Sequence, residues 1–340
     1  MAISVGIPQA LSFYSYYPLW KTCLESMGIK VVLSRPTNRD ILEWGIRETV
    51  TDACIPIKIF HGHVIDLKDR ADYLFVPRMV TVDGQATFCP KFLGLPDMVR
   101  FSGEQLPPVI DSSVQANRAG RGVFSFFRDV ARQLQIKMGF KGTAAVVRAC
   151  RKQEAYEQLL LQGLPPQQAM RFLEKKAAGP AVEQAAAAEN RSADNLRVAL
   201  LGYPYVLYDP FISANLYQRL KKMDVEPLTP EQVPPREMLR QSKVLPQNFF
   251  WHYSNRASWS SLYYLEQSGR VDGVIHVTAF GCGPDAMVDK FVELESKKRE
   301  VPFLTLTIDE HTGEGGIQTR LEAFVDMLRA KKEHEGKGRG

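Results

Sequence analysis

The sequence predicts an α/β protein with two doubly wound, parallel-sheet (Rossmann-like) domains related by an internal repeat. Three observations support this: two stretches of the chain resemble each other, short apolar strands alternate with helical segments in both, and the segment between them has helical periodicity without strand signals. We expect the first α/β domain at 1–111, a helical insertion and linker at 112–195, the second α/β domain at 196–330 and a flexible tail at 331–340.

The opening strand–helix–strand unit occurs twice. "ISVGIPQALSFYSYYPLWKTCLESMGIKVVLS" (3–34) resembles "VALLGYPYVLYDPFISANLYQRLKKMDVEPLT" (198–229). Each stretch has an apolar strand, a Gly-x-Pro turn, a Tyr followed shortly by Pro, an amphipathic helix and a second apolar strand. In this alignment of the two stretches, Gly6 and Pro8 correspond to Gly202 and Pro204.

The likeness continues into the third and fourth strands. "ADYLFVPRMV" (71–80) and "VDGVIHVTAF" (271–280) are apolar runs of the kind that buried parallel strands show. Each is followed by a Cys and a Pro-Asp helix, in "CPKFLGLPDMVR" (89–100) and "CGPDAMVDKF" (282–291). The strands of "LPPVIDSS" (106–113) and "VPFLTLTIDE" (301–310) then end in Asp, which completes a parallel sheet in each half.

Composition narrows the class of protein. The chain of 340 residues is 45% hydrophobic and 24% charged, which is ordinary for a globular protein of two domains. No stretch is apolar for long enough to span a membrane. The first twenty residues lack charge, but they are interrupted by Pro8 and Pro18 and have no basic segment typical of a signal peptide. We expect a cytoplasmic protein whose five cysteines are reduced thiols or metal ligands.

The cysteines fall at informative places. Cys89 and Cys282 both follow the third strand of their half, before a helix start, where doubly wound sheets bind ligands. Asp52 is the expected N-cap of the preceding helix, which places Cys54 in the first helical turn. Its counterpart in the second half is Ser254, so the repeat supplies two thiols from one half and one from the other.

Three thiolates near helix N-termini would repel one another unless a cation lies among them. A [4Fe-4S] cluster accepts three Cys ligands and keeps one iron open, whereas zinc would need His61, His63 or His252 as a fourth ligand. The chain matches no zinc-finger spacing, so zinc ranks second. Core thiols are the alternative for any single Cys, and we assign that role to Cys23 and Cys150.

Several motifs together resemble a known family. "VGIPQALSFYSYYPLW", "DACIPIKIFHGH", "FVPR", "FCPK", "FGCGPDA" and "DEHTGEGGIQTRLEAF" are similar to those of acyl-CoA dehydratase activase-related proteins, which resemble the 2-hydroxyacyl-CoA dehydratase subunits. The resemblance implies that Cys54, Cys89 and Cys282 hold a [4Fe-4S] cluster or a larger iron–sulfur cluster. It also implies an ATP-hydrolysing activase as electron donor and an acyl-CoA as substrate.

Candidate acid–base groups lie near these cysteines in the sequence. Lys58 and His61 share a helix face with Cys54, where they serve either a cluster and its substrate or helix packing. Glu310, with His311 beside it, follows a strand end and serves either catalysis or helix capping. His276, inside an apolar strand, is expected to be a hydrogen-bonded core histidine. A Walker motif and a GxGxxG motif are both missing, which argues against ATP or NAD binding by this chain.

The partners and the class of function are less constrained. Residues 118–152 carry nine Lys/Arg and a single acid, so they either dock an acidic redox partner or CoA phosphates, or form a solvated helix face. Aromatic residues are not interleaved there, so nucleic-acid binding is not expected. An iron–sulfur enzyme is the leading hypothesis, with a non-catalytic electron-transfer or scaffold subunit, or a small-molecule-binding module with structural thiols, as alternatives. The oligomeric state stays open between homodimer and heterodimer.

Overall fold

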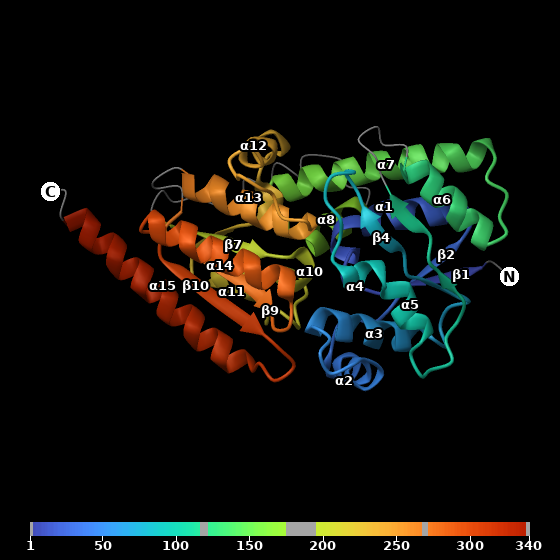
Figure 1. The fold of residues 1–340 in the computed structure, drawn as a ribbon, viewed down its shortest axis with the longest axis horizontal. Helices are drawn as coiled ribbons and strands as arrows, with labels where there is room; N and C mark the ends of the chain where they lie inside the picture. The colour runs from blue at the N-terminus through green and yellow to red at the C-terminus, as the bar shows by residue number, and fades with distance from the viewer. Residues whose placement is uncertain (1–2, 116–121, 175–194, 267–270, 338–340) are drawn as a thin grey trace. The chain divides into compact units, whose positions relative to one another are not determined.

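A computed structural model describes residues 3–115, 122–174, 195–266 and 271–337 (Figure 1). The chain divides into two units, which are described separately below. The first contains 1–159, 166–173 and 249–253, and the second contains 160–165, 174–248 and 254–340. Parts of the predicted insertion (116–121 and 175–194) and of the tail (338–340) lie outside the described residues. Within the described part of the chain, no helix is both long and apolar enough to cross a membrane.

The first unit is built on a parallel sheet with strand order β2-β1-β3-β5. Its strands are β1 (Ser4–Ile7), β2 (Lys30–Leu33), β3 (Tyr73–Phe75) and β5 (Val109–Ile110). The strand predicted over 71–80 is interrupted, because Pro77 has no N–H to donate to a neighbouring strand. The chain resumes as β4 (Arg78–Thr81), which pairs with β6 (Ser113–Gln115) in a separate two-stranded sheet. The prediction of one continuous strand was therefore wrong.

The helices of the first unit follow the alternation read from the sequence, and their bounds are α1 (Phe13–Ser26), α2 (Arg39–Glu48), α3 (Ile55–Leu67), α4 (Pro90–Leu93), α5 (Leu95–Arg100), α6 (Gly122–Gln133), α7 (Phe140–Leu161) and α8 (Pro166–Glu174). Residues of α6, of α7 as far as Leu159 and of α8 as far as Leu173 belong to this unit. Helix α2 begins at an N-cap, Asn38, whose side chain accepts a hydrogen bond from the Ile41 amide at 3.0 Å.

The second unit contains a parallel sheet with strand order β10-β9-β7-β8. Its strands are β7 (Leu196–Gly202), β8 (Val225–Leu228), β9 (Gly273–Ala279) and β10 (Phe303–Ile308). All seven residues of β9 are buried, as expected for a central strand covered on both faces. The helices are α10 (Pro204–Leu207), α11 (Leu216–Lys222), α12 (Pro235–Gln241), α13 (His252–Glu266), α14 (Gly283–Lys298) and α15 (Glu314–Lys337), with a 3-10 turn at Pro230–Gln232. The first two residues of α13 belong to the first unit.

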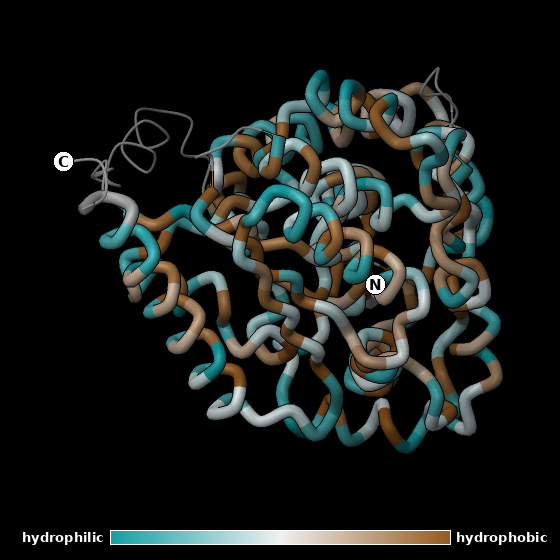
Figure 2. The backbone as a smooth tube through the Cα atoms, turned by 60° about the vertical axis from the view of Figure 1, so that its left-hand side comes forward, coloured by the Kyte–Doolittle hydropathy of each residue, from teal (hydrophilic) through white to brown (hydrophobic). Residues whose placement is uncertain are grey.

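Helix α15 shows how a helix is fixed to this sheet. Its hydropathy alternates along the helix in Figure 2, and the buried residues Ile317, Leu321, Val325 and Leu328 recur at helical spacing. Leu328 packs against Gly273 of β9, where a Cβ would lie 3.0 Å from its methyl groups. The small residue at the start of β9 thus admits the apolar face of α15.

Both sheets use an Asp in the same way. The Asp72 carboxylate accepts hydrogen bonds from the amide and the hydroxyl of Ser4, at 2.8 and 2.6 Å, which joins the start of β1 to the start of β3. In the second unit the Asp272 carboxylate accepts from the Arg197 amide at 2.6 Å, which joins β7 to β9. Counted along the chain, each four-stranded sheet also has the spatial order second, first, third, fourth strand. The predicted α/β fold with parallel sheets is confirmed.

Candidate functional site

Cys54 is the N-cap of α3. The prediction that Asp52 caps this helix was wrong, because the chain still turns at Asp52 and Pro56 sets the first helical turn two residues after the cysteine. Cys54 therefore precedes the helix instead of lying within its first turn. Its carbonyl accepts the first helical hydrogen bonds from the amides of Ile57 and Lys58, at 2.9 and 3.2 Å.

The position of Cys54 depends on a close contact between α2 and α3. A Cβ at Gly45 of α2 would lie 1.7 Å from the Lys58 carbonyl oxygen, and a Cβ at Gly62 of α3 would lie 1.8 Å from the Ile41 carbonyl oxygen. Only glycine allows the two backbones to approach this closely. Because α3 is held from both glycines, the helix start that carries Cys54 is fixed relative to α2.

Cys89 is the N-cap of α4, and the helix start predicted after it is present. The loop before it is held by Asp83, whose carboxylate accepts from the amides of Gln85 and Ala86 at 2.8 and 3.1 Å. Burial opposes ionisation of this carboxyl, but nearby His252 and the two amides hold the pKa of Asp83 well below its usual range. The loop is thereby kept in one conformation ahead of the cysteine.

The same loop is held by a second segment, residues 249–253. The Thr87 amide donates to the Phe250 carbonyl at 3.0 Å, and the His252 amide donates to the Thr87 carbonyl at 2.8 Å. The imidazole of His252 stacks on Phe88, with 5.2 Å between the ring centroids. His252 also pairs with Asp83, with 3.6 Å between Nδ1 and the carboxylate, so its role here is to support the loop.

The thiols of Cys54 and Cys89 lie near enough to interact electrostatically. Burial raises the pKa of both thiols, and Cys89 adds to the rise for Cys54. Lys91, two residues after Cys89, opposes the rise at both sulfurs. Its ammonium donates to the Asp52 carbonyl at 3.1 Å, so one cation connects the two cysteine loops. The sequence analysis missed Lys91, although "CPK" places a lysine in the first turn behind a candidate ligand.

Cys282 is the N-cap of α14 in the second unit. Because β9 and β10 are parallel neighbours with Ala279 opposite Ile308, the residues after them leave the same edge of the sheet. Cys282 and Glu310 therefore follow adjacent strands at the edge where doubly wound sheets bind ligands. Glu310 lies half-buried in the turn before α15.

A buried ionic cluster connects the start of α14 to β9. His276 of β9 lies with Nδ1 2.7 Å from the Asp289 carboxylate and Nε2 3.2 Å from the Asp285 carboxylate. Burial alone would lower the pKa of His276, but the two carboxylates outweigh it and raise the pKa to about 9. The expected core histidine is thus a charged one, and Asp285 fixes the first turn behind Cys282.

The predicted acid–base groups on α3 are buried. Lys58 is 3% exposed and His61 is 2% exposed. Burial lowers the pKa of His61 to about 4, and its Nε2 has no hydrogen-bond partner. His63 donates to or accepts from Thr37 at 3.0 Å, and burial lowers its pKa to about 3. These imidazoles are neutral bases held inside the unit.

Cys23 and Cys150 lie in the helices α1 and α7, away from helix starts, as the sequence suggested. Burial raises the pKa of Cys23 to about 12. None of the five cysteines, all of which lie in the described part of the chain, forms a disulfide. Among the described residues, no group of three or more His, Cys, Asp or Glu side chains is gathered closely enough to hold a metal ion.

Two family models match the chain. The model of the CoA enzyme activase uncharacterised domain (DUF2229) matches residues 4–233, which is more than half of the sequence. The chain belongs to this family. The model of the 2-hydroxyglutaryl-CoA dehydratase D-component matches residues 160–328, which include Cys282, Glu310 and the ionic cluster of His276. A search of curated proteins gave no match. The activase-related protein is thus similar to the dehydratase component across its second sheet, and the predicted resemblance is confirmed.

Proposed function

We propose that this activase-related protein binds a [4Fe-4S] cluster through Cys54, Cys89 and Cys282. The observation that carries the proposal is that three cysteines without disulfides each cap a helix with proline or glycine behind them, in a protein matched by both family models. Helix N-termini favour anionic ligands, and thiolates are the ligands of iron–sulfur clusters. The chemistry of the three donors therefore suits the group.

When bound, such a cluster supplies one-electron transfer at low potential. Cys54 and Cys89 would hold it from the first unit and Cys282 from the second. Lys91 would offset the negative charge of the thiolates, because its ammonium already acts on both sulfurs of the first unit. In this proposal an ATP-hydrolysing activase donates the electrons, and an acyl-CoA or another small substrate receives them, in the cytoplasm.

The burial of Lys58 and His61 favours the second candidate, an electron-transfer or scaffold subunit that serves a partner enzyme. A proton donor to a substrate must reach it within hydrogen-bond distance, and neither side chain has the exposure to do so. Glu310, half-buried at the sheet edge beside the Cys282 loop, is the candidate that retains access. Catalysis by this chain predicts that Glu310→Gln lowers turnover of an acyl-CoA by the reduced protein while cluster content is unchanged. A pure electron-transfer subunit predicts no turnover without its partner.

The cluster itself is tested by purification without oxygen. We expect brown protein containing iron and acid-labile sulfide, and lower iron content in Cys54→Ser, Cys89→Ser and Cys282→Ser. Cys23→Ser and Cys150→Ser are matched controls that should retain the wild-type iron content. Protein that takes up no iron after anaerobic reconstitution, or a Cys150→Ser variant that loses as much iron as Cys89→Ser, contradicts the proposal.

A further inference from the structure

The first unit contains a cavity that the proposed function does not use. It has a volume of about 250 Å³ and opens among α1, α6, α7 and the β4–β6 pair. A cavity of about 150 Å³ holds benzene, so this one has room for roughly ten non-hydrogen atoms. Its lining residues include neither Cys54 nor Cys89.

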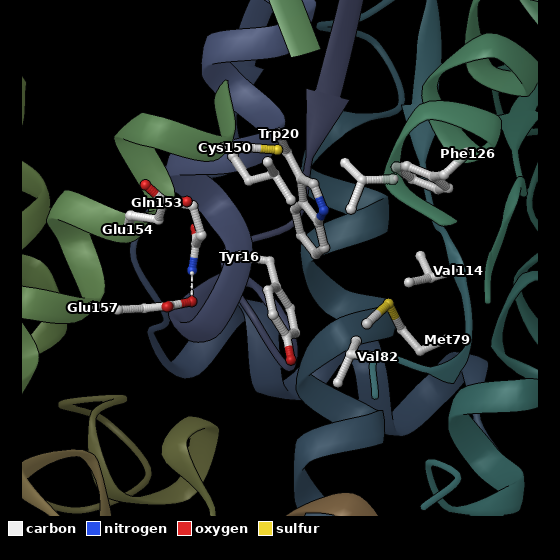
Figure 3. A pocket seen from close by; sticks show the side chains of 12 residues that line it. Tyr16, Trp20, Met79, Val82, Val114, Phe126, Cys150, Gln153, Glu154 and Glu157 are labelled. Atoms are coloured by element: carbon white, nitrogen blue, oxygen red, sulfur yellow. Dashed lines mark hydrogen bonds between the residues drawn. The ribbon is translucent and has the colours of Figure 1, made fainter. Parts of the chain in front are cut away.

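Most of the wall is apolar. Trp20, Met79 and Phe126 are at most 5% exposed and face the cavity from three different elements. In Figure 3, Met79, Val114 and Phe126 stand on one side, and Tyr16 and Trp20 separate them from the polar residues of α7. A ligand with a compact hydrocarbon or aryl body matches this wall.

The polar part of the wall offers hydrogen-bond acceptors. Gln153, 8% exposed, donates through Nε2 to the Ser15 carbonyl at 2.8 Å and to the Glu157 carboxylate at 3.0 Å. Both partners are acceptors, so the amide nitrogen must face them and the orientation of the amide is fixed. Its Oε1 is then a buried acceptor without a hydrogen-bond partner. A buried acceptor of this kind favours a ligand that brings an N–H or O–H donor.

The charges at the cavity indicate that the hydrogen-bond donor of the ligand is cationic. The charged residues that line the described cavity are Glu154 and Glu157, both exposed at its side, and no lining residue is Lys or Arg. Two carboxylates repel an anionic ligand such as a phosphate and attract a cation. The ring faces of Tyr16 and Trp20, whose centroids are 6.1 Å apart, also favour a cation.

We propose that this cavity binds a small primary amine in its protonated form, with an aryl or hydrocarbon body. The body packs against Trp20, Met79 and Phe126, while the ammonium donates to Gln153 Oε1 and faces the carboxylates of Glu154 and Glu157. This site is independent of the proposed cluster, because it uses none of the residues assigned to it.

Calorimetry on the full chain with three probes of one shape tests the proposal. Phenethylammonium should bind at least about tenfold more tightly than the neutral 2-phenylethanol, since the alcohol lacks the charge, and the anion phenylacetate should bind more weakly still. Amine binding should also slow alkylation of Cys150, a lining residue, by iodoacetamide. Cys89, outside the cavity, is the internal reference when the labelled sites are read by mass spectrometry.

Substitutions of lining residues test which side chains contribute to amine binding. Glu154→Gln and Glu157→Gln should each weaken phenethylammonium binding by about threefold to tenfold, and Gln153→Leu by about tenfold. Glu25→Gln removes an exposed carboxylate of α1 outside the cavity and should leave binding unchanged. The comparison of probes on wild-type protein stands even where Gln153→Leu fails to fold. Equal binding of amine and alcohol, amine binding that leaves Cys150 alkylation unchanged, or no amine binding at all overturns the proposal.

Discussion

Replacement of Gly62 by alanine tests the inference that close backbone contact between α2 and α3 places Cys54. The new Cβ would lie 1.8 Å from the Ile41 carbonyl oxygen, whereas an ordinary contact begins at 3.4 Å, so the two helices must separate by about 1.6 Å. Rotation of a side chain cannot relieve this clash, because the obstructing atom belongs to the backbone of α2.

The cost follows from what the two helices bury. Ile41 and Ile59 are completely buried, and a gap of this width is too narrow for water but removes the dispersion contacts across it. Overpacking of a core costs about 1–3 kcal/mol, and a backbone clash belongs at the upper end. We therefore expect Gly62→Ala to lower the free energy of unfolding of the first unit by about 3 kcal/mol.

Urea unfolding followed by circular dichroism measures this loss, and hydrogen exchange at the amides of Ile57 and Lys58 shows whether the start of α3 loosens. Gly139→Ala is the matched control, because nothing lies within 4 Å of a Cβ built at that position. If Gly62→Ala stays within about 0.5 kcal/mol of wild type, as surface substitutions do, the close approach does not position α3.

The charges of Lys91 and His276 and the neutral imidazole of His61 each have a measurable effect. Lys91→Met should slow alkylation of Cys54 and Cys89 at pH 8, because the ammonium that lowers the pKa of both thiols is lost; unchanged rates would exclude that role. His276→Ala should destabilise the second unit by about 3–5 kcal/mol in urea unfolding, since it leaves two carboxylates without their cation, and a loss below about 1 kcal/mol would contradict this. The pKa of His61 is about 4 in the folded chain, below its value of about 6.5 in the unfolded chain. As pH falls, the unfolded chain therefore binds a proton first, and the free energy of unfolding decreases from pH 6.5 downward. Between pH 7 and pH 5 the free energy of unfolding of wild type should fall by about 2 kcal/mol more than that of His61→Leu. Equal decreases would refute a neutral buried imidazole.

The sequence predicted those parts of the structure that local pattern controls. The apolar runs, the proline and glycine turns and the cysteines before helices were all visible along the chain, and the helices begin after Cys89 and Cys282 as expected. The helix start near Cys54 was misplaced by two residues, because Asp52 is the better capping side chain while Pro56 sets where the helix can begin.

Features that depend on contact between distant segments were not predictable. Gly45 and Gly62 look like weak points of their helices in the sequence, and only the packed pair shows that they admit a neighbouring backbone. Lys91 became relevant once its ammonium was found between two loops, and the burial of His61 depends on packing that spacing alone does not reveal.

The segment 249–253 has a consequence for how the protein is made. It belongs to the first unit, yet it is synthesised after residues 174–248, which belong to the second unit. Domains generally fold during synthesis from the N-terminus, but here the loop that carries Cys89 lacks its partners, Phe250 and His252, until those residues leave the ribosome. The first unit is therefore completed late, and a fragment that ends near residue 174 should retain its sheet while leaving the Cys89 loop unsupported.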